Sequence, residues 1–271
     1  MPTNDDGVRA VIFDISGTVL DYGSRGPVEA FVELFRRNGV PISEEEARRP
    51  MGAPKKDHIW AVLNDPDVSG RWASVHGSVA SREDLDRLYE QFTPLQIEVL
   101  RDHCDLIPGV VELTGQLRER GIRFANTTGF DSNMMTDLIR LAEADGYRPD
   151  VWVCPDMAGG GRPAPWMAFH AARHMGVYPM SRIVKVGDTL ADIDEGHAAG
   201  MWVVSVVRHG NEVGLSQEVL NALPRSESAS RIAAARERLA AKKPHYIIDA
   251  TADLMPVIEE ISWRISRGER P

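Results

Sequence analysis

Six short β-rich segments, separated by helical patterns, constrain the fold of this 271-residue chain more than any other feature. They are expected at residues 8–13, 122–125, 151–154, 183–186, 202–207 and 246–248. Strands that alternate with helices predict a doubly wound α/β fold of the Rossmann type, in which the sheet is mainly parallel. With 43% hydrophobic residues, the chain can bury one large core and still carry an insertion.

The interval between the first and second predicted strands is about a hundred residues, whereas a crossover between parallel strands needs only about a dozen. Helical patterns fill this interval, and the first of them runs from Pro27, suited to the first helical position, to Gly39, suited to a C-terminal cap. We therefore expect an α/β core formed by residues 1–21 and 104–271, with a helical cap domain inserted at 22–103.

Charge and composition exclude several classes of protein. The net charge is −9 and no basic tract extends beyond Lys242-Lys243, so a nucleic-acid surface is not expected. The sequence contains no run of about 18 apolar residues and opens without a signal-peptide pattern, which predicts a cytoplasmic protein with no membrane partner. The only cysteines, Cys104 and Cys154, fit a reducing compartment and are expected to be structural thiols.

An acidic residue, Asp14, follows the first predicted strand and is followed in turn by Ile15-Ser16-Gly17-Thr18. In open parallel sheets, ligands bind beyond the carboxyl ends of the strands, and a glycine turn leaves room for them. Asp14 therefore belongs either to a ligand site or to a simple turn that it caps.

Two later segments carry groups suited to an anion. Thr128 and Gly129 follow the second predicted strand, where hydroxyl and backbone N–H groups can hold a phosphoryl oxygen, although a plain turn is the alternative. Arg162 lies in a glycine-rich turn and is either a clamp for an anionic group or a solvated arginine.

A third segment adds carboxylates, because Asp188 follows a predicted strand and Asp192 lies at the start of the next helix. Carboxylates gathered near Asp14 would repel one another unless a cation lay between them. Oxygen ligands beside a phosphoryl group favour Mg²⁺. For Asp192, a helix-start position that favours the helix dipole is the alternative to metal binding.

Within the predicted cap, Pro54 can open a helix that places Lys55 in its first turn and His58 one turn later, with Met51 leading into it. A solvated surface lysine is the plain interpretation. However, the positive end of the helix dipole and burial in a cleft would both lower the pKa of Lys55, which would make its neutral amine available as a nucleophile.

Together these residues resemble the haloacid dehalogenase-like superfamily, with Asp14 in its first motif, Thr128 in its second, Arg162 at its basic position, and Asp188 and Asp192 in its acidic motif. Within it, the chain is similar nearly end to end to the phosphonatase family, which hydrolyses phosphonoacetaldehyde. The specific marks are Asp21-Tyr22-Gly23, Glu46-Ala47-Arg48-Arg49-Pro50-Met51-Gly52, Lys55 with His58, Gly161-Arg162-Pro163-Ala164-Pro165-Trp166-Met167 and Ala199-Gly200-Met201-Trp202.

The resemblance implies a mechanism in which Lys55 forms an imine with the aldehyde of a small phosphonate and Asp14 attacks phosphorus to give an aspartyl-phosphate. It also implies that His58 and Met51 flank the imine, where His58 either assists proton transfer or packs as a neutral ring. Thr128, Gly129 and Arg162 would then bind the phosphoryl group. The family further suggests a homodimer, formed through cap helices.

The implied cofactor is Mg²⁺, held by Asp14, Asp188 and the backbone carbonyl of Ser16, with Asp192 as a further candidate ligand. Most phosphatases of the superfamily carry an aspartate two residues after the nucleophile, and Ser16 stands there instead. This departure argues against an ordinary phosphate-ester hydrolase, because such an enzyme must protonate an oxygen leaving group.

Two smaller departures keep the substrate open, namely Phe130, where a tyrosine is often found, and Ala53-Pro54, where larger aliphatic residues are common. The alternative enzyme is a phosphatase or other phosphoryl-transfer member of the superfamily, which would be favoured if Lys55 proved dispensable. A module that binds phosphonate or phosphate without turnover is the alternative outside enzymes.

Overall fold

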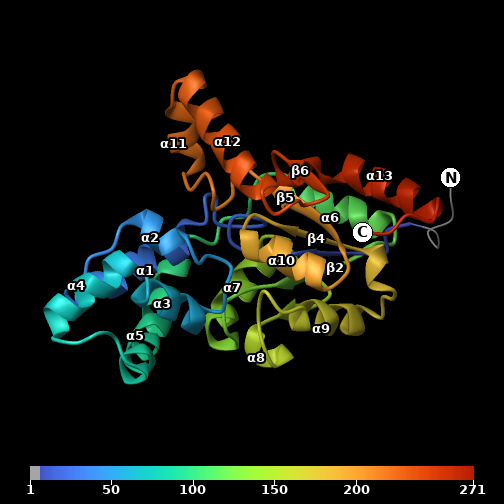
Figure 1. Ribbon diagram of the computed structural model, residues 1–271. Coiled ribbons are helices and arrows are strands. Elements are labelled where there is room, and N and C mark those ends of the chain that lie inside the picture. The colour runs from blue at the N-terminus through green and yellow to red at the C-terminus, as the bar shows by residue number, and fades with distance from the viewer. Residues whose placement is uncertain (1–6) are drawn as a thin grey trace.

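A six-stranded sheet forms the centre of the computed structural model, which describes residues 7–271 (Figure 1). The strand order is β3-β2-β1-β4-β5-β6, and every neighbouring pair is parallel. The strands are β1 (Ala10–Phe13), β2 (Arg123–Thr127), β3 (Trp152–Val153), β4 (Ile183–Gly187), β5 (Trp202–Val206) and β6 (Tyr246–Ile248). All six predicted strands and the predicted fold class are confirmed, and the sheet is parallel throughout.

The register of the central strands determines where the chain's polar loops meet. Phe13, the last residue of β1, pairs with Asn126 of β2 on one side and with Val186 of β4 on the other. The loops that follow these three strands therefore emerge at one edge of the sheet, at the point where the strand order reverses direction. Asp14 leaves the sheet at the centre of this edge.

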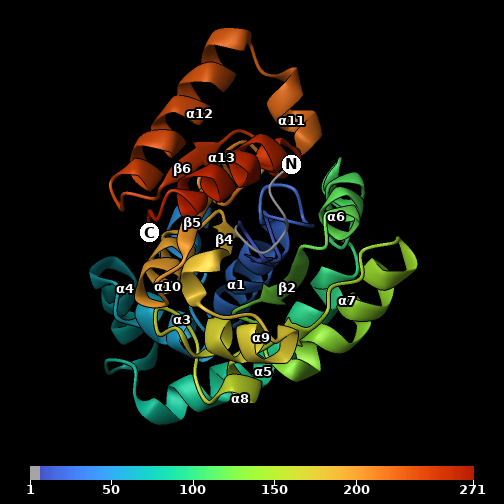
Figure 2. The same cartoon turned by 90° about the vertical axis from the view of Figure 1, so that its right-hand side faces the viewer.

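Helices cover both faces of the sheet (Figure 2). Val11 and Phe13 of β1 belong to a buried cluster with residues of α6 (Val110–Glu119), α7 (Ser132–Ala144) and α13 (Leu254–Ser266). Ala10 and Ile12 belong instead to a cluster with residues of α9 (Trp166–Met175). Successive strand residues point to opposite faces, so burial on both sides explains why the strands read as continuous apolar runs.

Four further helices belong to the core. α10 (Leu190–Ala198) packs on β4 and β5, and α12 (Arg225–Ala240) on β6. The two short helices are α8 (Pro155–Ala158) and α11 (Gln217–Ala222). In the part of the chain that the structure describes, no helix is both long and apolar enough to span a membrane.

Five of the six helices between β1 and β2 pack on one another beside the sheet (Figure 1, blue to teal). They are α1 (Arg25–Arg37), α2 (Glu44–Arg48), α3 (Lys55–Leu63), α4 (Pro66–His76) and α5 (Arg82–Leu100). Phe31 of α1 stacks on Phe92 of α5, with 4.5 Å between ring centroids, inside this helical unit. The helical insertion is therefore present, whereas the domain boundaries at 21/22 and 103/104 stay predictions, and residues 1–6 of the predicted core lie outside the described residues.

The start of α1 differs from the sequence prediction. The helix begins at Arg25, so Pro27 is its third residue and not its first. The reason is the buried Asp21 carboxylate, which accepts hydrogen bonds from the backbone N–H groups of Arg25 (2.9 Å) and Gly26 (3.1 Å). A side chain four residues upstream thus satisfies the free N–H groups of the first turn, which sequence spacing alone did not indicate.

Candidate active site

A single pocket brings together residues from the cap helices and from the edge of the sheet. Seven of the predicted site residues line it, and these are Asp14, Ser16, Met51, Lys55, Thr128, Gly129 and Arg162. Ser24, Pro27, Gly52, Phe130 and Thr189 complete its wall. His58, Asp188 and Asp192 do not line this pocket; they are buried beside it.

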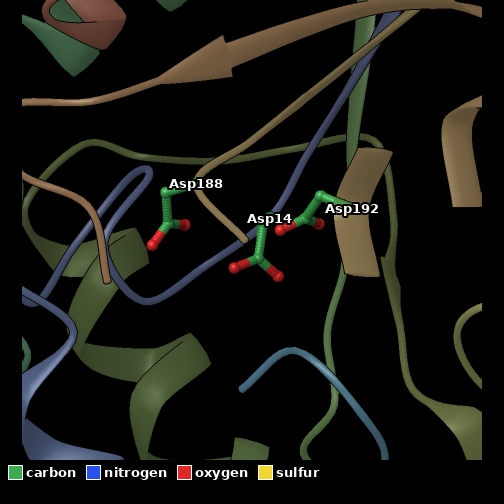
Figure 3. Close-up of side chains that lie close together, drawn as sticks. All are labelled: Asp14, Asp188 and Asp192. Atoms are coloured by element: carbon green, nitrogen blue, oxygen red, sulfur yellow. The ribbon is translucent and has the colours of Figure 1, made fainter. Parts of the chain in front are cut away.

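Three carboxylates converge beneath the pocket (Figure 3). Asp14, Asp188 and Asp192 each offer an oxygen atom within 4.8 Å of the others, and all three are buried. One Asp188 oxygen accepts from the Thr18 hydroxyl (2.7 Å) and the other from the backbone N–H of Asn211 (2.7 Å). Burial, with Asp14 and Asp192 nearby, raises the pKa of Asp188 well above its usual range. This cluster has the donor set of a site for a hard cation.

Arg162 is buried against Asp14, so the solvated alternative for this arginine is wrong. Its Nη2 donates to Asp14 Oδ1 (2.7 Å) and to the backbone carbonyl of Thr127 (2.7 Å), and its Nε donates to Glu195 Oε2 (3.0 Å). Burial raises the pKa of Asp14, while the charge of Arg162 opposes that rise. The guanidinium therefore holds the Asp14 carboxylate in a fixed orientation at the pocket floor.

A second buried cation, Lys185, and its partner Glu195 were not among the residues predicted from the sequence. Lys185 Nζ lies 2.8 Å from Thr127 Oγ1 and 3.0 Å from both Asp192 Oδ1 and Glu195 Oε2. Gly196 leaves room for it, because a Cβ there would lie 3.1 Å from the Lys185 Cβ. A charged residue in the middle of a buried strand was the available signal, since such a residue is kept only when it is paired.

These buried ion pairs leave an unbalanced charge. The network contains the carboxylates of Asp14, Asp188, Asp192 and Glu195, which carry four negative charges when all are ionised, whereas Arg162 and Lys185 are the cations directly paired with it. The excess of two negative charges matches one divalent ion.

Asp192 fits both of its predicted roles. It lies in the acidic cluster, and its Oδ2 also accepts from the N–H (3.1 Å) and hydroxyl (2.6 Å) of Thr189 in a capping box. Burial works to raise its pKa, but Arg162 and Lys185 outweigh this and lower it.

Replacing Lys185 with methionine is expected to lower the free energy of unfolding by about 3–5 kcal/mol, because two buried carboxylates would lose a cation. Urea unfolding would measure this difference. The matched control is Lys242→Met, since Lys242 pairs with Asp194 (2.7 Å) at the surface and should change stability by less than about 1 kcal/mol. Equal effects of the two substitutions would contradict the structural role of Lys185.

Lys55 is buried, so the plain interpretation of a surface lysine is wrong. It is the first residue of α3, and its Nζ lies 4.7 Å from the ring centroid of Phe130 and 5.5 Å from that of Phe31. Burial lowers the pKa of Lys55 to about 8, although the charge of Asp14 opposes the change. Met51 Sδ lies 3.9 Å from Nζ. The pocket thus contains an amine that loses its proton far more readily than an ordinary lysine.

His58 packs behind Lys55 in the cap. Its ring stacks on Phe31 with 3.8 Å between centroids, and its Nε2 lies 2.8 Å from the carbonyl oxygen of Ala47, to which it can only donate. Burial and the nearby Lys55 charge lower the pKa of His58 well below 6.5, so the ring is neutral. Its Nδ1 has no hydrogen-bond partner among residues 7–271. This geometry supports a packed neutral ring, and the assistance of His58 in proton transfer stays a prediction.

Two glycines, Gly52 and Gly129, lie where the cap contacts the core. A Cβ on Gly129 would lie 2.5 Å from the carbonyl oxygen of Ala53, and a Cβ on Gly52, whose φ is +91°, would overlap the Thr189 hydroxyl. The backbone N–H of Lys55 also donates to the Gly129 carbonyl (3.2 Å). Glycine at both positions therefore allows the turn before α3 to rest on the loops that follow β2 and β4.

Thr128 and Ser16, two further predicted site residues, line the pocket, and the predicted role of the Ser16 backbone carbonyl as a metal ligand stays a prediction. The Thr128 hydroxyl accepts from the backbone N–H of Phe130 (3.2 Å), which fixes the turn and leaves its oxygen at the pocket wall. The Ser16 hydroxyl is buried and finds no hydrogen-bond partner within the described residues. An unpartnered hydroxyl beside the carboxylate cluster fits a place for a bound ion or substrate.

A six-stranded parallel sheet with an inserted helical unit, and an acidic cluster at the strand-order reversal, define a hydrolase of the haloacid dehalogenase type. The family model for haloacid dehalogenase-like hydrolases matches residues 8–200. Within that class, the chain belongs to the phosphonoacetaldehyde hydrolase family. It is 40% identical to the phosphonoacetaldehyde hydrolase of Nitratidesulfovibrio vulgaris, over 98% of this chain and 95% of that protein. It is 42% identical to the Paraburkholderia phytofirmans enzyme of the same name, over 97% of this chain and 99% of that protein.

Solved structures agree with this assignment. The crystal structure of a phosphonoacetaldehyde hydrolase-like protein from Oleispira antarctica matches with a TM-score of 0.96 at 40% identity, covering 98% of this chain and 96% of that one. A β-phosphoglucomutase from Clostridium difficile matches with a TM-score of 0.67 at 17% identity, covering 95% of this chain and 98% of that one. The second match shows the fold alone. The chain is therefore an enzyme of the phosphonoacetaldehyde hydrolase family.

Proposed function

We propose that this enzyme hydrolyses the C–P bond of 2-phosphonoacetaldehyde, releasing acetaldehyde and phosphate through a lysine imine and an aspartyl-phosphate. One observation carries the proposal: the buried amine of Lys55, from the cap helices, and the carboxylate of Asp14, from the core, line the same pocket. The names of the relatives point to the same substrate.

The amine answers the main chemical difficulty of the reaction. Direct cleavage of the C–P bond would expel a carbanion, which is a poor leaving group. Condensation of the Lys55 amine with the aldehyde releases water and gives a protonated imine, which can accept the C–P bonding electrons as an enamine. The pKa of Lys55, about 8, supports this step because a neutral amine must attack the carbonyl carbon.

In the second step, an Asp14 carboxylate oxygen attacks phosphorus as the C–P bond breaks, which forms an aspartyl-phosphate and the enamine. Water then hydrolyses the acyl phosphate and returns the carboxylate with release of phosphate. Protonation of the enamine carbon and hydrolysis of the imine release acetaldehyde and restore Lys55. Arg162, which donates to Asp14, and Thr128 with Gly129 would bind the phosphoryl oxygens, and their positions in the pocket lining support this role.

Mg²⁺ is the proposed cofactor, and the excess of two negative charges around Asp14 supports a divalent ion. Asp14, Asp188 and the backbone carbonyl of Ser16 would hold it, with Asp192 as a further candidate ligand. When bound, the ion would screen phosphoryl charge from the Asp14 carboxylate. The homodimer and the cytoplasmic location inferred from the sequence stay predictions.

The test is acetaldehyde release from 2-phosphonoacetaldehyde in the presence of Mg²⁺, coupled to alcohol dehydrogenase, with a parallel sample in EDTA. The proposal expects release with Mg²⁺ and strong loss of release in EDTA. A folded protein that instead releases phosphate from phosphate esters and leaves the phosphonate intact would favour the phosphatase alternative. Binding of the phosphonate without release of either product would favour the binding module.

The rate of imine formation is expected to rise with pH through a midpoint near 8 and then to level off, because only the neutral Lys55 amine attacks the aldehyde. The lowered pKa moves this midpoint down from the 10.5 of an ordinary lysine. Reduction with borohydride after short incubations across a pH series, followed by mass spectrometry, would measure it. A midpoint near 10.5 would show that the amine is not buried as the structure describes.

A further inference from the structure

Arg48, the last residue of α2, joins the cap helices to the core through backbone and side-chain oxygens. Its Nη1 donates to the carbonyl oxygens of Gly23 (3.0 Å) and Ser24 (3.2 Å) and to Asn211 Oδ1 (3.2 Å), and its Nη2 donates to the Gly214 carbonyl (3.0 Å). The side chain is only 15% exposed. One guanidinium thus contacts four acceptors from two segments far apart in the chain.

Both segments matter for the pocket. Gly23 and Ser24 lie where the chain leaves the core for α1, and the Gly23 N–H is held by the carbonyl of His209 (2.8 Å). Asn211 lies in the loop after β5, and its backbone N–H donates to the carboxylate of Asp188 (2.7 Å). Arg48 therefore ties α2 to the loop that orients an acidic residue of the candidate metal site.

On its other side, Arg48 supports the turn that covers the pocket. Its backbone carbonyl accepts from the N–H of Met51 (3.0 Å), and both Met51 and Gly52 line the pocket. This turn leads directly into Lys55 at the start of α3. Movement of Arg48 away from its acceptors would therefore shift the turn that places Lys55 opposite Asp14.

The loop after β5 is shaped to receive the guanidinium. Gly214 has a φ of +68°, and a Cβ there would lie 2.8 Å from Arg48 Cζ. A planar group with several donors can satisfy acceptors from both segments at once, whereas a lysine ammonium on its single nitrogen cannot span them. The site is thus built for arginine.

We propose that Arg48 is a positioning residue that holds the cap helices closed on the core, and that it does so through the Gly23–Ser24 segment and the Asn211–Gly214 loop. The contact stands on its own geometry, whereas its consequence for turnover rests on the proposed function. Without the Arg48 contacts, a smaller fraction of the molecules would have the cap closed on the core, and the apparent substrate affinity would fall by the same fraction.

The experiment compares Arg48→Gln and Arg48→Lys with the neighbouring control Arg49→Gln. Arg49 follows Arg48, but its partners Asp65 (2.6 Å) and Glu45 (3.2 Å) both belong to the cap segment. Hydrogen exchange of the Lys55 amide reports closure directly, because this N–H donates to the Gly129 carbonyl across the boundary. Steady-state kinetics on 2-phosphonoacetaldehyde provide the second readout.

In Arg48→Gln we expect the Lys55 amide to exchange about tenfold faster and KM to rise about tenfold, with kcat changed less than about threefold. Arg48→Lys should show a smaller change in the same direction. Because this variant keeps the positive charge, it can be measured even if Arg48→Gln fails to fold. Arg49→Gln should match the wild type. Wild-type exchange and KM in both Arg48 variants, or an equal effect of Arg49→Gln, would overturn the proposal. The wild type could also fail to turn over 2-phosphonoacetaldehyde while the Lys55 amide still exchanges faster in Arg48→Gln. That result would uphold the role of the Arg48 contact and reject only the proposed function.

Discussion

Replacing Lys55 with arginine is expected to abolish release of acetaldehyde from 2-phosphonoacetaldehyde, with kcat reduced at least about a thousandfold. A guanidinium keeps its proton at any accessible pH and does not condense with the aldehyde, so the C–P bonding electrons would have no acceptor. The coupled alcohol dehydrogenase assay measures the loss, and borohydride reduction should leave no substrate-derived group on the protein.

The neighbouring lysine provides the control for this substitution. Lys56 is exposed and pairs with Asp86 (2.5 Å) at the surface of the cap, so Lys56→Arg should leave turnover within about twofold of the wild type. Circular dichroism would confirm that both variants are folded. Unchanged turnover in Lys55→Arg would exclude the imine and move the assignment to a phosphatase or other phosphoryl-transfer enzyme.

The sheet was predictable because its physics is local to each strand. Strands buried on both faces are mostly apolar, so the six appeared in the sequence as short β-rich runs, although polar residues such as Asn126 and Lys185 interrupt two of them. The positions of Asp14 and Asp188 followed from the same logic, since a polar residue directly after such a run emerges at the ligand-binding edge. The start of α1 was wrong because Asp21, which caps it, acts from four residues upstream.

The charged network below the pocket was harder to predict because its members come from four separate segments. Lys185 and Glu195 meet Thr127 only after β2 and β4 take their places on either side of β1. The role of Arg162 depended on the same assembly, since its turn gave no indication that the side chain would be buried against Asp14. Sequence spacing indicates which face or edge a residue occupies, but not its partners across the sheet.

Cap and core thus contribute separately to one site. The core supplies a fixed carboxylate in an overall negative network, and the cap supplies the amine of Lys55. Phe31 of the cap and Phe130 of the core together bury this amine, and burial lowers its pKa. Separation of the two would expose Lys55 to water and return its pKa toward that of an ordinary lysine. In the proposed mechanism, closure would therefore both assemble the reacting groups and activate the amine.

Replacing Asp14 with asparagine should stop phosphate release, with kcat lowered roughly ten-thousandfold or more, and yet leave imine formation intact. The amide has nearly the shape of the carboxylate and can still accept a hydrogen bond from Arg162 Nη2, but it is a poor nucleophile toward phosphorus. Borohydride should therefore still attach substrate to Lys55, which separates the two steps within one variant. The exposed Asp102→Asn substitution is the control and should keep wild-type turnover. Phosphate release that survived in Asp14→Asn would mean that water attacks phosphorus directly, whereas loss of the imine as well would mean that Asp14 is needed to place the substrate against the amine.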